Sequence, residues 1–169
     1  MASSLIYIRP IPVVFVRAYG AYEQSVHRAW GRMFKWMDAN GLGAEVDIGY
    51  GLAYDDPRTT PSERCRYEAC ITIPSQVPAE RLAVLDKMLL PPGVYAKDRL
   101  TGSYESMGKM VTCIRDEWAP RHGLAVDRTR PVITIYRNNP RYCPAETLQA
   151  DICLPIAALA DTAPLRSAA

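Results

Sequence analysis

The chain has 169 residues, of which 49% are hydrophobic and 22% are charged, with a formal net charge of +2. Such a chain is long enough to fold without a disulfide or a metal ion, as one ordinary domain or as two small modules that share a core. Basic residues are spread along it, so we expect no direct binding of nucleic acid. No apolar run approaches the length of a membrane span and the amino terminus has no signal-peptide pattern, so the sequence predicts no membrane association and a cytoplasmic location.

The chain opens with a strand and a helix. An apolar, β-branched stretch over 5–17 is interrupted by prolines, and its second part, 13–18, is predicted to be a strand. From about 23 to 40 the apolar residues recur every three or four positions, which is typical of one face of a helix. Gly41 is expected to end this helix, because glycine readily takes the left-handed conformation found at helix ends.

Two further strands complete the first half. The first is predicted over 47–54 and ends at a turn that contains Pro57. The second, over 65–73, alternates apolar and polar residues, which indicates a strand with one buried face. The segment 75–86 is then predicted to be a linker with one short helical turn.

The second half repeats the order strand, helix, strand, strand. The first strand is predicted over 94–100, and the helix over 104–121 ends before a glycine. Strands follow over 131–136 and 148–154. The fold class is therefore predicted to be α+β, with a duplicated strand-helix-strand-strand module that forms a curved antiparallel sheet.

Sequence identity between the halves supports the duplication. The segment Arg17-Ala-Tyr-Gly-Ala-Tyr-Glu returns 82 residues later as Arg99-Leu-Thr-Gly-Ser-Tyr-Glu, and Trp36 matches Trp118 at the same offset. An offset of 83 relates Asp55-Asp56-Pro57 to Asn138-Asn139-Pro140, as expected from a one-residue insertion or deletion in a loop. Such ordered matches are the signature of an internal repeat.

The repeat predicts the domain organisation. We expect a single domain over 1–156, made of two repeats over about 5–74 and 88–156. The alanine-rich segment 157–169 is predicted to be a flexible tail.

The cysteines predict neither a metal site nor a disulfide framework. Five cysteines are an odd number, and none forms a Cys-x-x-Cys pair. The two histidines are isolated on predicted helices. We therefore expect no metal ion and no cofactor.

A ligand cleft is predicted on the sheet face that the helices leave open. One helix per repeat covers one face, so the two modules would form a central cleft on the other face, near their pseudo-twofold axis. If Ile133 and Ile135 face the helices, side-chain alternation assigns the intervening residues to the cleft. The candidate ligand-binding residues are Tyr50, Leu52, Tyr54, Glu68, Val132, Thr134, Tyr136 and Asp151.

Tyrosine rings beside a few carboxylates suit flat aromatic or cationic small molecules, because ring faces attract cations and desolvated carboxylates supply a countercharge. A purely structural interpretation also exists, since tyrosine is common on half-exposed strands. Arg17 and Arg99 are expected to pair with acidic neighbours, and Glu23 and Glu105 to stabilise helix starts.

Several short segments together resemble the GyrI-like family of small-molecule (effector) binding domains, which includes DNA gyrase inhibitory proteins and the ligand-binding domains of AraC-type and multidrug-sensing regulators. The resemblance extends from about Ile8 to Ile156. The segments are Ala21-Tyr22-Glu23-Gln24, Tyr54-Asp55-Asp56-Pro57, Thr60-Pro61-Ser62-Glu63, Arg66-Tyr67-Glu68-Ala69-Cys70-Ile71, Gly93-Val94-Tyr95-Ala96 and Ile135-Tyr136-Arg137-Asn138-Asn139-Pro140.

The resemblance implies the duplicated fold with a central ligand cleft, and a role in binding. Relatives that bind cationic drugs commonly carry a glutamate where this sequence has Thr134, which offers a hydroxyl but no charge. Either Glu68, Asp151 or Glu105 supplies the countercharge from another wall, or the ligands are neutral.

Three functions are compatible with the sequence. The first is a stand-alone protein, not an enzyme, that senses or sequesters amphipathic aromatic compounds, cations among them. The second is a protein-interaction module whose partner is DNA gyrase or a regulator. The third is a hydrolase of reactive DNA-alkylating natural products, with acid–base candidates among Glu68, Asp151, Tyr50 and Tyr136.

Overall fold

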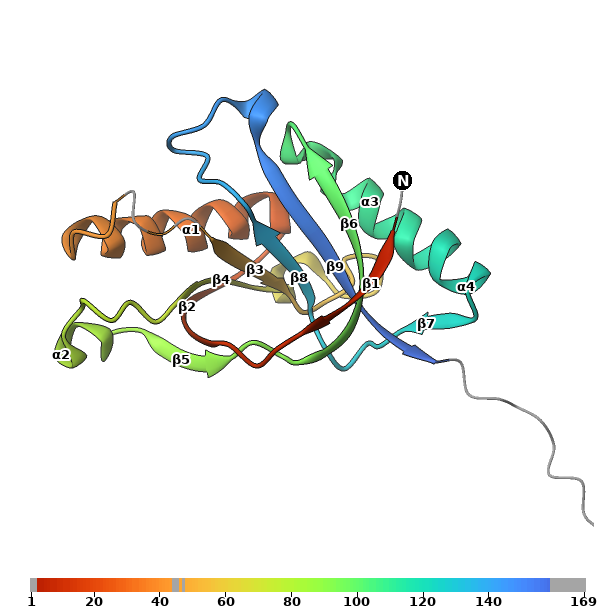
Figure 1. The fold of residues 1–169 in the computed structure, drawn as a ribbon, viewed down its shortest axis with the longest axis horizontal. Helices are drawn as coiled ribbons and strands as arrows, with labels where there is room; N and C mark the ends of the chain where they lie inside the picture. Colours follow the sequence, from red (N-terminus) through yellow and green to blue (C-terminus); the bar gives the residue numbers. More distant parts are fainter. Residues whose placement is uncertain (1–2, 44–45, 47, 159–169) are drawn as a thin grey trace, which may run out of the picture.

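The computed structural model describes residues 3–43, 46 and 48–158, which form one large antiparallel sheet with helices on one side (Figure 1). The strands are β1 (Ser4–Ile8), β2 (Pro12–Tyr19), β3 (Gly49–Ala53), β4 (Arg66–Thr72), β5 (Asp86–Leu89), β6 (Gly93–Thr101), β7 (Leu124–Val126), β8 (Val132–Tyr136) and β9 (Gln149–Ala158). The helices are α1 (Tyr22–Ala39), α2 (Ala79–Leu82), α3 (Met107–Cys113) and α4 (Ala119–Arg121), with a π-helical turn at Ile114–Trp118 and 3₁₀ turns at Ser62–Arg64, Tyr104–Ser106 and Ala145–Thr147.

The predicted duplication is confirmed by the topology. The strand order is β1-β6-β9-β8-β3-β4-β2-β5, with β7 added to the end of β9. In each half the third strand lies between the first and the second. The halves meet where β3 pairs with β8, with Gly51 opposite Thr134, so an approximate twofold axis passes through the middle of the sheet.

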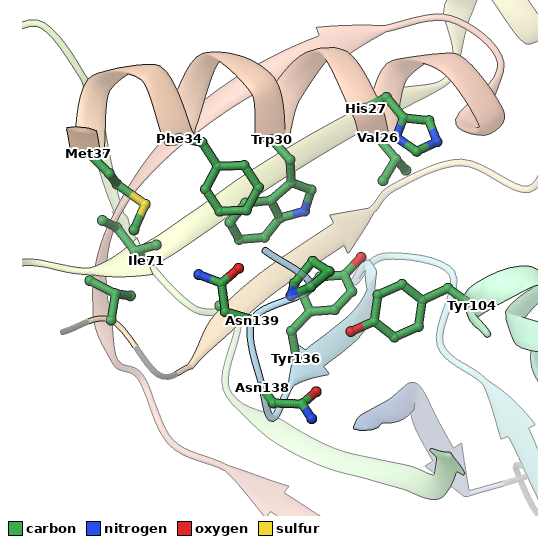
Figure 2. Close-up of a pocket in the computed structure, with 13 residues that line it drawn as sticks. Val26, His27, Trp30, Phe34, Met37, Ile71, Tyr104, Tyr136, Asn138 and Asn139 are labelled. Carbon is green, nitrogen blue, oxygen red and sulfur yellow. The ribbon is translucent and has the colours of Figure 1, made fainter. Parts of the chain in front are cut away.

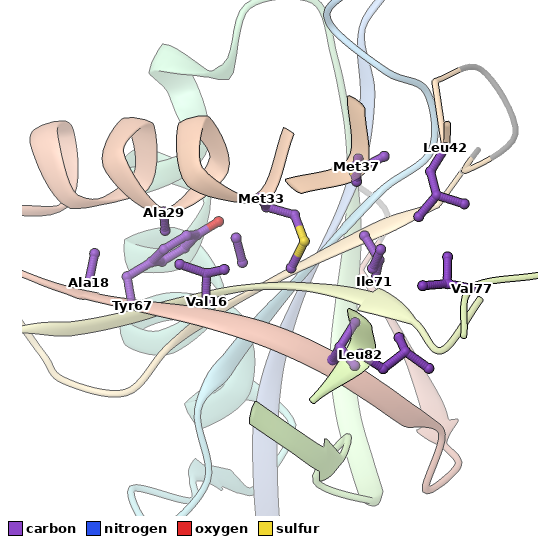
Figure 3. Packing of buried hydrophobic residues seen from close by; sticks show 12 residues of the cluster. Val16, Ala18, Ala29, Met33, Met37, Leu42, Tyr67, Ile71, Val77 and Leu82 are labelled. Carbon is purple, nitrogen blue, oxygen red and sulfur yellow. The ribbon is translucent and has the colours of Figure 1, made fainter. Parts of the chain in front are cut away.

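Both predicted helices are present, and the periodicity of the sequence explains them. In α1, Ala29, Met33 and Met37 recur at four-residue spacing and are buried against the sheet (Figure 3). The helix ends at Gly41, which has a φ of +70°. The segment 104–121 is helical but irregular, because the π-helical turn separates α3 from α4. None of the helices among the described residues is long and apolar enough to cross a membrane.

Three strands were not predicted. The sequence predicts a strand only in the second part of the apolar stretch 5–17, which leaves out β1. β5 and β7 are too short for alternation to be recognised. The predicted end of the domain at residue 156 is also too early for the sheet, because β9 continues to Ala158 alongside β7. Asp47, the predicted start of the third element, and residues 159–169 of the predicted tail lie outside the described residues.

The sheet is strongly curved. β1 and β2 are joined by three residues, although six strand intervals separate them in the sheet. In a flat sheet this separation would be about 29 Å at 4.8 Å per interval. Three linking residues reach only about 14 Å. β5 and β6 are likewise joined by three residues although they lie near opposite ends of the strand order. The two ends of the sheet must therefore bend toward each other.

Curvature gives the two faces different surroundings. We call the face that carries α1 and α3 the helix face; Tyr67, Ala69, Tyr136 and Ile152 belong to it. We call the opposite face the strand face; Leu52, Cys70, Ile133 and Cys153 belong to it, and all four are buried. The strand face therefore forms a packed core inside the bend. The prediction that β4 has a single buried face is wrong, because Glu68 and Cys70 are as buried as Ala69 and Ile71.

Candidate functional site

A cavity of about 280 Å³ lies on the helix face, between α1 and the loop that follows β8 (Figure 2). Its size is at the lower end of the range for small-molecule sites, and most of its walls are apolar. The lining residues are Val26, His27, Trp30, Phe34, Met37, Val46, Gly49, Ile71, Tyr104, Tyr136, Asn138, Asn139 and Pro140.

The first wall is one side of α1. Val26, Trp30, Phe34 and Met37 follow each other at spacings of four, four and three residues, so a single stripe of the helix faces the cavity. The rings of Trp30 and Phe34 are 5.3 Å apart between centroids. His27, which is exposed, lies at the edge of this wall. The helix thus presents two aromatic rings to a bound molecule.

The floor is built around Tyr136 of β8. Its ring meets Trp30 edge to face, with a centroid distance of 5.4 Å and an interplanar angle of 89°. Trp30 Nε1 donates a hydrogen bond to Tyr67 Oη at 3.0 Å, and Tyr67 Oη and Tyr136 Oη are hydrogen-bonded at 3.0 Å. Burial raises the pKa of Tyr67 well above its ordinary value. The network is therefore uncharged, and it fixes the rings at the cavity floor.

Two glycines of β3 allow the rings to lie this close to the sheet. A Cβ atom on Gly49 would lie 2.5 Å from Cη2 of Trp30, and one on Gly51 would lie 2.2 Å from Oη of Tyr67. Both distances are shorter than any side chain tolerates. The Gly-Tyr-Gly sequence of β3 is thus a requirement of the aromatic floor.

Tyr104 forms the wall that belongs to the second half. Its ring is 5.3 Å from the Tyr136 ring at an angle of 61°. Its hydroxyl is buried and has no hydrogen-bond partner among the described residues. Burial raises the pKa of Tyr104 to about 12, so the phenol keeps its proton at neutral pH.

The loop after β8 closes the cavity. Asn138 is held in place because its Oδ1 accepts a hydrogen bond from Gln149 N at 2.9 Å and its Nδ2 donates to Thr147 O at 2.8 Å. Further along the loop, Arg141 forms a double ion pair with Asp38 of α1, at 2.9 and 3.0 Å. These contacts join a loop of the second half to the helix of the first.

Among the described residues, buried side chains occupy the part of the strand face where the cleft is predicted. Tyr50, Leu52, Tyr54, Glu68 and Asp151 do lie on the strand face, as predicted. However, Leu52, Glu68 and Asp151 have no exposed surface. The bend of the sheet, which alternation along one strand does not reveal, turned the expected cleft into a core.

The prediction assigns the side chains of β8 to the wrong faces of the sheet. Ile133 and Ile135 belong to the strand-face core, whereas Val132 and Tyr136 pack on the helix face. Thr134, which pairs with Gly51 and Ile152, lies on the helix face as well.

The error lies in the assumption that Ile133 and Ile135 face the helices. The repeat offset also changes along the chain. The offset of 82 residues holds for the first strand of each half, but Glu68 corresponds to Asp151, and Cys70 to Cys153, at an offset of 83. A shift of one residue moves every side chain of a strand to the other face. Tyr136 is the one predicted candidate that lines the cavity.

The strand-face carboxylates are neutralised by arginines. Glu68 accepts hydrogen bonds from Arg17 Nε at 2.8 Å and from Tyr54 Oη at 2.7 Å. Asp151 is paired with Arg99 and Arg137. Arg17 and Arg99 do pair with carboxylates, but these lie on the neighbouring strands and not at the turns where acidic partners are predicted.

Among the described residues that line the cavity, none carries a carboxylate. Glu105, the third predicted source of a countercharge, is exposed and does not line it. Within the described residues, no group of three or more His, Cys, Asp or Glu side chains is placed to hold a metal ion.

Sequence reasoning missed the α1 wall. The three- and four-residue spacing places Val26, Trp30 and Phe34 in the same apolar stripe as Ala29 and Met33, which predicts one buried helix face. An apolar stripe with two residues in each turn is wider than contact with a sheet alone requires. That width is the signal that could have indicated a second apolar contact for α1.

Comparisons with known proteins agree with this architecture. The model of the GyrI-like small molecule binding domain matches residues 1–157. The chain is 30% identical over 127 residues to the probable transcriptional regulator YgiV of Escherichia coli (strain K12), which covers 75% of this chain and 78% of YgiV.

Three solved structures share the fold. The C-terminal domain of EcmrR aligns with a TM-score of 0.70 at 13% identity, over 93% of this chain and 98% of that domain. SAV2435 bound to tetraphenylphosphonium aligns with a TM-score of 0.63 at 15% identity, over 94% of this chain and 96% of that chain. A hydrolase encoded by lin2189 from Listeria innocua aligns with a TM-score of 0.59 at 14% identity, over 92% of this chain and 91% of that chain. At such identities the likeness concerns the fold alone, but the family model covers nearly the whole chain, and the chain therefore belongs to the GyrI-like family of small-molecule-binding domains.

Proposed function

We propose that the protein senses or sequesters a small, flat, neutral aromatic compound, which binds in the helix-face cavity. The observation that carries this proposal is the convergence of four aromatic rings on one cavity, with Trp30 and Phe34 from the first half and Tyr104 and Tyr136 from the second. Rings provide a large apolar contact area and prefer the edges and faces of other rings.

None of the described residues that line the cavity carries a carboxylate, which supports a neutral ligand. Ring faces attract cations, but a desolvated cation also needs a countercharge. Glu68 and Asp151 are on the strand face and are paired with arginines. Thr134, on the helix face, offers only a hydroxyl. Tetraphenylphosphonium, the cation bound by SAV2435, would therefore be a poor ligand for this cavity.

Binding is better supported than catalysis, although one structural neighbour is a hydrolase. General acid–base chemistry needs a carboxylate or another base within hydrogen-bond reach of the substrate. Of the four acid–base candidates, Tyr136 alone lines the cavity, and burial raises its pKa. The relationship to YgiV supports a sensing role, in which ligand occupancy is passed to a regulatory partner.

The proposal is tested by isothermal titration calorimetry with three naphthalene probes that differ in charge: 2-naphthylmethanol, 2-naphthyltrimethylammonium and 2-naphthoate. We expect saturable binding that is tightest for the neutral alcohol. Phe34→Leu should weaken it by about fivefold to tenfold, because a ring contact is worth roughly 1 kcal/mol.

Phe15→Leu is the matched control, since Phe15 lies on the strand face and should leave the affinity unchanged. Tightest binding of the cation would refute the neutral-ligand assignment. If none of the three probes bound, the proposed binding function would fail.

A further inference from the structure

The two halves place a buried carboxylate at equivalent positions on the strand face, but they surround it differently. Glu68 pairs in register with Arg17 across β2 and β4, and Asp151 pairs with Arg99 across β6 and β9. The approximate twofold symmetry therefore lets one half serve as an internal reference for the other.

The charges of the first half are balanced. The carboxylate of Glu68 is bound by one guanidinium, that of Arg17, and by the neutral hydroxyl of Tyr54. The neighbouring strand position on the same face is Phe15, whose ring lies 5.6 Å below the guanidinium carbon of Arg17. A second arginine, Arg66, lies with its guanidinium carbon 5.2 Å from the centre of the Tyr54 ring and is paired with Asp55. Each of the two cations thus faces one anion.

The second half carries two additional cations. Arg137 stands at the position of Tyr54, at an offset of 83, and Lys97 stands at the position of Phe15, at an offset of 82. Lys97, Arg99 and Arg137 accompany the single carboxylate of Asp151, so the cluster has a formal charge of +2. The side chain of Lys97 forms no hydrogen bond or ion pair with any described residue.

The geometry leaves donors available to a second anion. Arg99 binds Asp151 through Nε at 2.7 Å and Nη2 at 3.1 Å, and Arg137 binds it through Nε at 2.9 Å and Nη2 at 2.6 Å. Neither residue uses Nη1 on the carboxylate. Asp151 is fully buried, whereas the side chains of Arg99 and Arg137 are 50% and 37% exposed. The carboxylate thus orients two guanidinium groups without neutralising the cluster.

We propose that Lys97, Arg99 and Arg137 form a binding site for a small oxyanion, a phosphate or a carboxylate group, on the strand face. Guanidinium groups bind both anions through paired, charge-assisted hydrogen bonds. An anion would also relieve the repulsion among three cations held close together. The site lies on the opposite face from the aromatic cavity, and the proposal does not depend on the function assigned to that cavity.

The test is a titration of the ¹⁵N-labelled chain with inorganic phosphate and, separately, with acetate, followed by backbone amide chemical shifts at constant ionic strength set with chloride. We expect saturable shifts at residues 97–99, 137 and 151. Saturation by phosphate alone or by acetate alone would identify which oxyanion the site accepts.

Three variants decide whether the cluster is responsible. Lys97→Gln removes a cation whose ammonium group has no hydrogen-bond or ion-pair partner among the described residues. Arg137→Tyr copies the first half while keeping a hydroxyl donor for Asp151. Each should weaken binding at least about fivefold, the effect of losing one charged hydrogen bond. Arg121→Gln, on α4, removes the same charge from an exposed position and should have no effect.

If neither anion gave saturable shifts in the wild type, or if Arg121→Gln weakened binding as much as Lys97→Gln, the proposal would be overturned. Because the Lys97 side chain forms no hydrogen bond or ion pair with a described residue, the Lys97→Gln variant remains informative even if Arg137→Tyr does not fold.

Discussion

Successive residues of strands β3 and β8 point to opposite faces of the sheet, and these two faces are covered by different elements. On the strand face, Leu52 and Ile133 are fully buried in a continuous core. On the helix face, Gly49 and Tyr136 border a cavity. The comparison shows that alternation along a strand assigns residues to faces, but the elements above each face decide which one remains hollow.

The positions of the helices explain the difference. α1 packs on the first half, where Met33 and Met37 meet the side chains of its strands, and the α3 segment packs on the second half through Met110 and Ile114. Neither helix is centred on the β3–β8 pair, where the halves join. A space therefore remains above these two strands on the helix face, while the curvature of the sheet closes the space on the other face.

Leu52→Ala should show the largest effect and would test the assignment of the strand face as a core. Truncating a fully buried leucine costs about 2–5 kcal/mol of unfolding free energy, since it leaves a cavity. We expect urea denaturation to show this loss, and the affinity for 2-naphthylmethanol to be unchanged while the protein is folded. A small stability loss with weakened binding would instead place the ligand on the strand face.

Gly51→Ala tests the opposite face. The added methyl group would overlap Tyr67 Oη, and we expect a loss of about 1–3 kcal/mol in stability together with weaker ligand binding. Gly31→Ala is the control, because a Cβ there meets nothing within 4 Å. That change should stabilise α1 by about 0.5–1 kcal/mol. Equal effects of the two substitutions in urea denaturation would contradict the role given to Gly51.

Tyr67→Phe should have a smaller effect. It leaves Trp30 Nε1 and Tyr136 Oη without a shared partner, at a cost of roughly 1–2 kcal/mol. Half-buried Trp30 is accessible to water, which limits the loss. Tyr50→Phe provides the comparison on the strand face, where the hydroxyl of Tyr50 has no hydrogen bond to any described residue. Thermal unfolding of both variants would measure the difference, and equal melting temperatures would count against the network.

The smallest expected effect is a pH dependence on the helix face. Burial raises the pKa of Tyr104 from 10.0 to about 12 in the folded protein. Below pH 10 the phenol keeps its proton in both the folded and the unfolded chain, so its contribution to the free energy of unfolding is complete. As the pH rises toward 12, the phenol of the unfolded chain ionises first and the stability of the folded protein falls. Tyr104→Phe should reduce the loss of stability between pH 10 and 12. Parallel pH profiles for variant and wild type would show that the phenol contributes nothing.

Local patterns in the sequence were sufficient for the order of the elements that the two halves share. Helix α1 was predicted from its three- and four-residue periodicity, and its end from Gly41, because both depend on neighbouring residues only. The repeated motif indicated that Arg17 and Arg99 have acidic partners, but the partners themselves, Glu68 and Asp151, are set by strand pairing. The edge strands β5 and β7 were beyond such reasoning, since strands of three or four residues contain too few positions to show a period.

The sequence by itself determined that two similar strand-helix-strand-strand units are present, because repeated motifs and hydrophobic periods are properties of the chain alone. The face that holds the cavity was decided only by the tertiary structure. Two long-range features were responsible: the bend that brings the sheet ends together, and the pairing of β8 with β3 and β9, which revealed the one-residue change of offset. Since that pairing sets the face of every side chain of β8, Tyr136 reaches the aromatic cavity and Ile133 enters the core.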